Sequence, residues 1–341
     1  MKLNEKEYKT ISNYTGLCLV IFVVMINVTT VIATFSTGIF EPFIEYDWLY
    51  SVESVLSMIA YLSSFIVPAI ILRAILKKKG VLQPLNLEYR TPKSSFLLIP
   101  ATIAVTLCFA YINTWIMSFF GVSEAYNQMV GVSMQPYEPY QILLMFLSTA
   151  LVPAICEEFL FRGTVLSNLL PFGQVTAITV SAVLFGLMHQ NPYQIIYTTV
   201  AGFLIGYAYV KTRSIWCPTF IHFFNNAFSI TEEVIIKNGD PEISGVIVLI
   251  MDIGIVFIGI LCLSLYIIIE HRKKKKKYDG GSFGVILESS HKYEQKPIAR
   301  GKKVRCFFSG GMIAFIVVAV LSMLLLLAMM IFMTFMSGTA I

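Results

Sequence analysis

Two adjacent glutamates, Glu157 and Glu158, stand at the end of an apolar run, where ionisable residues are rare. An ionisable side chain costs about 2.5 to 3.5 kcal/mol at the centre of a membrane-inserted helix, so such residues usually have a function. On a helix, Glu158 and Arg162 stand four residues apart and can pair, whereas Glu157 is rotated by about 100°. This spacing neutralises one carboxylate and leaves that of Glu157 available. The alternative is that both glutamates mark the cytoplasmic end of a helix.

Two histidines also fall within apolar runs, each with a second side chain one helical turn away. Phe185 and His189 share one face of a predicted helix, and His222 and Asn226 share one face of another. Polar side chains that point the same way within lipid indicate a common polar partner. Taken singly, His189 is also explained as an interface residue, and His222 with Asn226 as interhelical hydrogen-bonding groups. Three such segments together indicate one polar site.

The elements that carry these residues are membrane-spanning helices. The 341-residue chain is 57% hydrophobic and 13% charged, which excludes an ordinary soluble protein. A span needs about 20 apolar residues, and about nine such runs are present. They predict an all-α, polytopic transmembrane bundle of about eight to nine spans. The runs are Leu17–Phe35, Val52–Leu76, Phe96–Phe120, Ile142–Phe161, Val175–Met188, Tyr193–Val210, Trp216–Ile230, Ile247–Ile269 and Phe308–Phe335.

Basic residues between these runs indicate how the chain is oriented, because lysine and arginine stay on the cytoplasmic side. On this count the basic clusters fall on one side, and the Gly121–Pro139 loop falls outside. The chain is therefore predicted to be a multi-pass protein of the cell membrane with a cytoplasmic N-terminus and an uncleaved first span. The clusters comprise Lys2, Lys6, Lys9, Lys77–Lys79, Arg90, Lys93, Lys211, Arg213, Arg272–Lys277, Lys302, Lys303 and Arg305.

The chain divides into three parts. Residues 1–270 are predicted to form the transmembrane core, residues 271–306 a basic cytoplasmic linker, and residues 307–341 an additional transmembrane helix. The run Arg272–Lys277 anchors the topology and attracts anionic lipid, which accounts for the net charge of +5 without a nucleic-acid partner. All six cysteines lie within or beside apolar runs, so no disulfide framework is expected.

The motifs and their order resemble the CAAX-protease/bacteriocin-processing family, also called the Abi family. Its pattern is Glu-Glu-x-x-x-Arg, then Phe-x-x-x-His, then His-x-x-x-Asn, on successive transmembrane helices. The resemblance implies a helical bundle with a conical polar cavity, and an intramembrane endopeptidase that hydrolyses a peptide bond. Residues 142–230 carry the pattern as Glu157, Glu158, Arg162, Phe185, His189, His222 and Asn226.

The resemblance also implies a role for each motif residue. Glu157 would be the general base that activates a water together with His189, while His222 and Asn226 would stabilise the oxyanion. The other three residues would support them. The substrate would be a membrane-associated peptide or a lipidated protein, and the sequence does not distinguish a prenylated C-terminus from a peptide precursor.

Whether a metal takes part is a separate question. Glu157, His189 and His222 form a set that could bind zinc and leave a position open for water. The sequence His-Glu-x-x-His is absent, however, and a glutamate with a histidine can activate water without a metal. We expect a metal-free mechanism without a cofactor, with zinc bound by these three residues as the alternative.

Two other functions use polar groups within a membrane. A non-proteolytic membrane scaffold or bacteriocin-immunity protein would bind a partner in the same cavity without cutting it, but the motif set is complete. A transporter would line a substrate path with its charges, but no inverted repeat is evident. Asp252, deep within the eighth predicted span, is left unassigned.

The position of His189 raises a geometric difficulty. If the fifth span is a straight helix from the cytoplasmic side, a rise of 1.5 Å per residue carries His189 about 20 Å away from Glu157. We therefore expect the fifth and sixth segments to be tilted, bent or incompletely spanning around Gly186 and Pro192.

Overall fold

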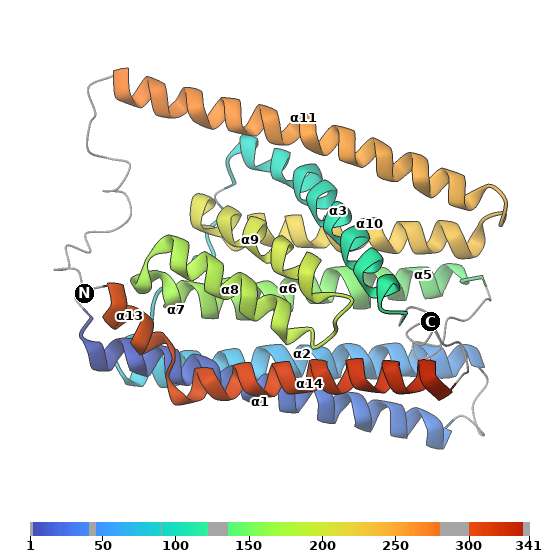
Figure 1. Ribbon diagram of the computed structural model, residues 1–341, viewed down its shortest axis with the longest axis horizontal. Coiled ribbons are helices and arrows are strands. Elements are labelled where there is room, and N and C mark those ends of the chain that lie inside the picture. The colour runs from blue at the N-terminus through green and yellow to red at the C-terminus, as the bar shows by residue number, and fades with distance from the viewer. Residues whose placement is uncertain (1–2, 41–45, 90, 122–135, 280–299, 337–341) are drawn as a thin grey trace.

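The computed structural model describes residues 3–40, 46–89, 91–121, 136–279 and 300–336. Within these residues all of the regular structure is helical, which confirms the predicted all-α bundle (Figure 1). Five long helices account for much of it. They are α1 (Glu5–Phe40), α2 (Tyr46–Lys78), α3 (Leu98–Phe119), α11 (Ser244–Asp279) and α14 (Gly310–Met336). A short 3₁₀ turn, η2 (Lys93–Leu97), precedes α3.

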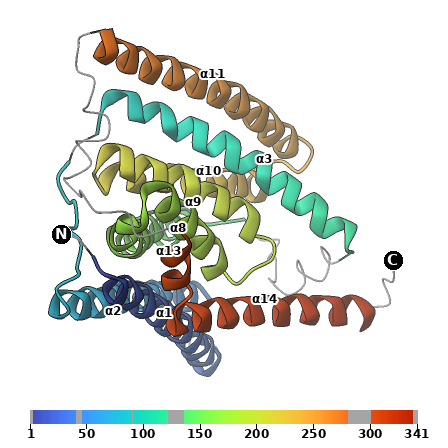
Figure 2. The same ribbon diagram turned by 60° about the vertical axis from the view of Figure 1, so that its left-hand side comes forward.

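The helices are arranged in layers (Figures 1 and 2). Helices α1, α2 and α14 lie on one side, and α3 and α11 lie on the other. The central helices pack between them, with α6 against α2 and α9 against α3, so both sides of the centre are covered. These central helices are α6 (Val152–Leu160), α8 (Gln174–Met188), α9 (Ile195–Thr212) and α10 (Trp216–Asn238).

Six helical segments of the described residues are long and apolar enough to cross a membrane, which confirms the multi-pass architecture. The other three predicted spans correspond to α8, α9 and α10. Helix α8 has only 15 residues, too few at 1.5 Å each to cross a hydrocarbon core about 30 Å thick. The fifth segment is thus incompletely spanning, as expected. The six spans are Glu5–Ser36, Tyr50–Lys78, Lys93–Phe119, Pro139–Phe172, Ser244–Lys273 and Gly310–Met333.

The fourth span is one helical run that is interrupted by two π-helical turns. It begins with α5 (Pro139–Met145) and the π-turn η3 (Phe146–Leu151), and continues through α6. The second π-turn η4 (Phe161–Leu166), the short helix α7 (Ser167–Leu169) and the 3₁₀ turn η5 (Leu170–Phe172) complete it. The prediction that Glu157 and Glu158 end this span was therefore wrong. The run continues beyond Arg162 because that arginine is buried and paired, and does not mark the membrane surface.

The chain reverses at Gly173, whose φ of 117° is accessible to glycine at little cost. Helix α8 then returns beside the second half of the fourth span. Glu157 and His189 stand equally far along the chain from Gly173, so the antiparallel return brings both to the same level. The separation of about 20 Å, which we expected a tilted, bent or short segment to reduce, does not arise, because Glu157 lies within the fourth span rather than at its cytoplasmic end. The break in the fifth segment follows Met188, in the connection that contains Pro192.

Helix α14 is docked along α1 through a contact between glycines. A Cβ atom on Gly311 would overlap the backbone carbonyl of Asn13, and one on Gly16 would overlap the backbone of Gly311. Such close approach of two backbones is typical of small residues at interfaces between membrane helices. The Gly311 amide also donates to the Asn13 side-chain oxygen at 2.8 Å. The predicted additional C-terminal helix therefore packs on the core.

The region predicted as a basic linker is partly helical. Helix α11 continues to Asp279, so the run Arg272–Lys277 lies on the end of a helix. Helix α13 (Arg300–Phe307) precedes α14 and packs on α1. Residues 280–299 of the predicted linker lie outside the described residues.

Candidate active site

The two adjacent glutamates are both buried but have different partners. Glu158 is 0% exposed, and its Oε1 atom accepts a hydrogen bond from Arg162 Nη1 at 2.9 Å. The same oxygen accepts a second hydrogen bond from Nδ1 of His222 at 2.8 Å. The ion pair expected from the four-residue spacing is present, and His222 of α10 extends it to a second helix. Glu158 thus links the Glu-Glu-x-x-x-Arg motif to the His-x-x-x-Asn motif.

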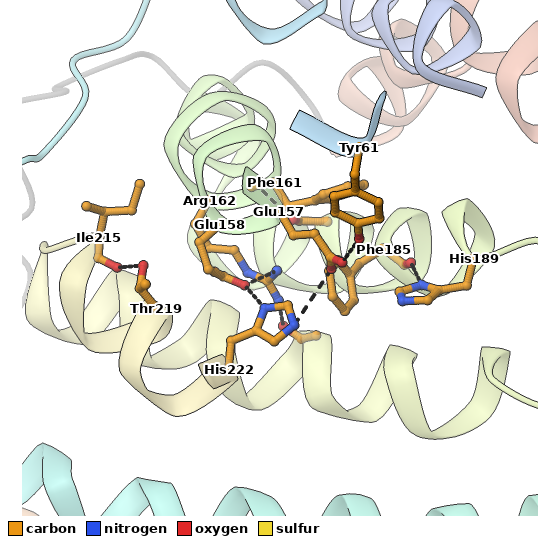
Figure 3. Close-up of polar contacts among 12 residues, drawn as sticks. Tyr61, Glu157, Glu158, Phe161, Arg162, Phe185, His189, Ile215, Thr219 and His222 are labelled. Carbon is orange, nitrogen blue, oxygen red and sulfur yellow. Dashed lines mark hydrogen bonds and ion pairs between the residues drawn. The ribbon is translucent and has the colours of Figure 1, made fainter. Parts of the chain in front are cut away.

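Arg162 connects Glu158 and His222 to the Phe-x-x-x-His motif. Its guanidinium lies 4.5 Å from the centroid of the Phe185 ring, and its Nη2 atom donates to the Gly202 carbonyl at 3.3 Å. The Phe185 ring also meets the rings of His189 and His222 edge-on, with centroids 5.1 and 5.9 Å apart. A cation over a desolvated aromatic face contributes about 2 kcal/mol. Phe185 is therefore the ring around which the charged residues are arranged (Figure 3).

Glu157 is 3% exposed and is the glutamate that remains available for chemistry. Its Oε1 atom accepts a hydrogen bond from the hydroxyl of Tyr61 on α2. Its Oε2 atom is buried without a hydrogen-bond partner among the described residues. This atom lies 3.8 Å from Nε2 of His222, which is too far for a direct hydrogen bond. A buried carboxylate oxygen in this situation requires a donor, and a water or a substrate group would supply one.

His189 follows directly after α8, at the same end of the helix as Phe185. Its Nδ1 atom lies 2.9 Å from the Phe185 carbonyl oxygen. A carbonyl only accepts, so Nδ1 carries the hydrogen and Nε2 of the neutral ring carries the lone pair. His189 is therefore set to accept a proton at Nε2.

The contact with Glu158 likewise fixes the ring of His222. Since the Glu158 oxygen is paired with Arg162 and accepts from Nδ1, the Nδ1 atom of His222 is protonated. Its Nε2 atom then faces Glu157 as a lone pair in the neutral ring, or as a donor when the ring is doubly protonated. The oxyanion role predicted for His222 requires the doubly protonated form.

Asn226 and His222, which were predicted to stabilise an oxyanion together, have different hydrogen-bond partners in the structure. Its amide donates to the Thr149 carbonyl in η3 at 3.0 Å. Pro153, four residues after Thr149, has no N–H to donate to that carbonyl, so the asparagine supplies a donor instead. This interhelical bond uses one of the two N–H groups of the Asn226 amide, and the oxyanion role of Asn226 stays a prediction.

The zinc alternative can be tested against the same geometry. No group of three or more histidine, cysteine, aspartate or glutamate residues among those described is arranged to hold a metal ion. Of the proposed ligand set, Glu157 and His222 face each other, and Nδ1 of His189 donates to its own helix, which leaves Nε2 as the nitrogen through which His189 could bind a metal. The metal-free mechanism and its zinc alternative both stay predictions.

Two residues complete the comparison with the sequence analysis. Tyr61 was not identified, because it lies on an apolar helix about a hundred residues before Glu157 and has no local pattern to mark it. Asp252 is 5% exposed and accepts a hydrogen bond from Tyr111 of α3, so it belongs to the interface between α3 and α11. The predicted polar cavity stays a prediction.

The part of the chain that contains the candidate site is similar to a known protein family. Residues 139–228 match the family described as type II CAAX prenyl endopeptidase Rce1-like. The chain carries an Rce1-like segment. That segment includes each of the motif residues and agrees with the resemblance found over residues 142–230.

One curated relative also matches part of the chain. A stretch of 86 residues is 31% identical to YdiL of Bacillus subtilis (strain 168), which is described as a candidate membrane peptidase. The stretch covers 25% of this chain and 35% of YdiL, so the chain matches about a third of the length of that relative. No solved structure matches the chain at a significant level.

Proposed function

We propose that the chain is an intramembrane endopeptidase that hydrolyses a peptide bond of a membrane-associated peptide or lipidated protein. The observation that carries this proposal is the pair of atoms Glu157 Oε2 and His222 Nε2, buried and 3.8 Å apart within the Rce1-like segment. The glutamate oxygen has no other partner among the described residues, and a carboxylate can accept a proton from water. The similarity to a candidate membrane peptidase supports the same chemistry.

In the proposed reaction, Glu157 removes a proton from a water while the water oxygen attacks the scissile carbonyl carbon. The lone pair on Nε2 of His189 helps to orient that water. His222 donates from Nε2, in its doubly protonated form, to the oxyanion of the tetrahedral intermediate. Glu157 then delivers the proton to the leaving amine as the C–N bond breaks. This sequence of steps uses no metal ion.

We also propose that the N-terminus faces the cytoplasm of the cell membrane. Lys211 pairs with Glu270, and Lys273 donates to Ser94 at 3.0 Å, so the basic ends of α9 and α11 lie together beside η2. Basic residues gathered at one end of a bundle indicate its cytoplasmic side.

The proposed activity can be tested with purified protein in liposomes. One probe is a fluorogenic peptide that ends in a farnesylated CAAX sequence, and the second is the same peptide without the farnesyl group. Cleavage of either probe by the wild type, with none by Glu157→Gln, supports the endopeptidase. Cleavage of the first probe alone assigns a prenylated substrate. Binding without cleavage of both probes would instead identify a scaffold protein.

The natural substrate is best sought in cells. Membrane proteomes of cells that carry the wild type and the Glu157→Gln form are compared, and a peptide precursor should accumulate in the variant. Identical proteomes would count against a processing function.

A further inference from the structure

The contact between Tyr61 and Glu157 joins the candidate site to a part of the chain that the comparisons do not cover. Tyr61 lies on α2, whereas the Rce1-like segment begins at residue 139. Its hydroxyl donates to Glu157 Oε1. Figure 3 shows the tyrosine reaching the glutamate from the side opposite His222.

The tyrosine ring is itself held in place by the packing of α1 against α2. Its centroid lies 4.6 Å from that of Phe65, which is 1% exposed. Phe65 in turn packs on Phe22 of α1, with centroids 4.5 Å apart. The hydroxyl is therefore presented from a fixed ring rather than from a mobile side chain, so little conformational entropy is lost when the hydrogen bond forms.

The bond has a direct consequence for the carboxylate. With Oε1 committed to Tyr61, rotation of the Glu157 carboxylate is restricted, and Oε2 is the oxygen that faces His222. We infer that Tyr61 is a positioning residue, which fixes the carboxylate of Glu157 so that Oε2 faces the reacting groups. This inference rests on the proposed endopeptidase function and assigns α2 a part in it.

A purely structural role for Tyr61 would have a different effect from a positioning role. A structural hydroxyl would change the amount of folded protein, whereas a positioning hydroxyl changes the rate of the chemical step. Displacement of a catalytic group by about 1 Å can cost about 100-fold in rate. Loss of an interaction that matters only in the transition state lowers kcat while KM stays unchanged.

The test compares two tyrosine-to-phenylalanine variants in liposomes with the farnesylated CAAX peptide as the probe. Tyr61→Phe keeps the ring contact with Phe65 and removes only the hydroxyl. Tyr111→Phe is a matched control, because Tyr111 also donates to a carboxylate, that of Asp252, but at the interface of α3 and α11. Rates are expressed per amount of monodisperse protein, so that a loss of folded protein is not counted as a loss of kcat.

We expect Tyr61→Phe to lower kcat by about 10- to 100-fold, as for a hydrogen bond to a charged group, with KM changed by less than about twofold. Tyr111→Phe should retain the wild-type kcat. Equal kcat for Tyr61→Phe and the wild type would overturn the role of Tyr61 and leave the endopeptidase intact. If the wild type cleaves neither the farnesylated nor the unmodified peptide, the endopeptidase itself is contradicted, and the role of Tyr61 fails with it.

Discussion

The Nε2 atom of His222 lies 3.8 Å from the Oε2 atom of Glu157, and each residue is held by a hydrogen bond to its other polar atom. His222 is bound through Nδ1 to Glu158, and Glu157 through Oε1 to Tyr61. The two atoms that face each other come from α10 and α6, so their separation depends on how these helices pack. In the proposed reaction Glu157 activates the water and His222 donates to the oxyanion, so this packing sets the distance between the two roles.

Replacing Glu157 by glutamine should abolish cleavage and leave the folded protein nearly unchanged. Glutamine keeps the size of the side chain and an oxygen that can accept from Tyr61, but it cannot take a proton from water. Cleavage of the farnesylated peptide and the thermal unfolding midpoint in detergent are the measurements. A glutamine variant that loses folded protein in proportion to its activity would show that Glu157 is structural.

Breaking the pair of Glu158 and Arg162 should act mainly on stability. Both side chains are 0% exposed, and removing one partner of a buried ion pair typically costs about 3 to 5 kcal/mol. Glu158→Gln and Arg162→Ala should therefore lower the yield of folded protein and the unfolding midpoint.

The control for this prediction is Glu5→Gln, which breaks an ion pair with the same four-residue spacing. Glu5 and Lys9 are about half exposed, and surface pairs contribute about 0 to 1 kcal/mol. An equally small effect of all three substitutions would contradict the structural importance that we assign to the buried pair.

The sequence predicted which motif residues lie close together better than it predicted where the fourth span ends. The four-residue spacings placed Arg162 beside Glu158, and the motif order placed histidines from two other helices nearby, because helical periodicity determines which side chains share a face. The end of the fourth span was misplaced because Arg162 resembles a residue at the membrane surface. Its burial depends on Glu158, Phe185 and Gly202, and the last two lie on other helices.

The contacts of Asn226 and Tyr61 show a second limit of sequence reasoning. The spacing of Asn226 and His222 correctly places both on α10, but a helix of 3.6 residues per turn leaves freedom in which neighbour each side chain meets. Asn226 meets the Thr149 carbonyl because Pro153 alters the hydrogen bonding of the fourth span. Tyr61 joins the site only through tertiary packing of α2 against α6, which no local spacing reveals.

Substitution of Gly311 should separate α14 from α1. A Cβ atom at this position would overlap the backbone of Asn13, and backbone has no other rotamer to adopt. Gly311→Val should lower the free energy of unfolding by about 1 to 3 kcal/mol, as is usual for overpacking. The unfolding midpoint should fall accordingly. Gly254→Ala is the control, since nothing lies within 4 Å of a Cβ atom there. Unchanged stability in both variants would show that α14 is not docked as described.

The orientation of the chain can be measured with topology reporters. A reporter fused after Lys277 should be cytoplasmic, and one inserted in the loop between Gly121 and Pro139, most of which lies outside the described residues, should face the other side. The expectation follows from the basic cluster on α11 and the lack of one in that loop. Cytoplasmic exposure of both reporters would overturn the proposed topology.

His222→Gln distinguishes the metal-free mechanism from one that uses zinc. Losing one donor to an oxyanion costs about 100- to 1,000-fold in kcat, so the variant should retain weak cleavage of the farnesylated peptide. Chelators should leave this residual activity and the wild-type activity unchanged. A zinc ligand behaves differently, because its loss removes both the metal and the activity. Stoichiometric zinc in the purified wild type, with activity lost on chelation and restored by the metal, would contradict the mechanism proposed for Glu157 and His222.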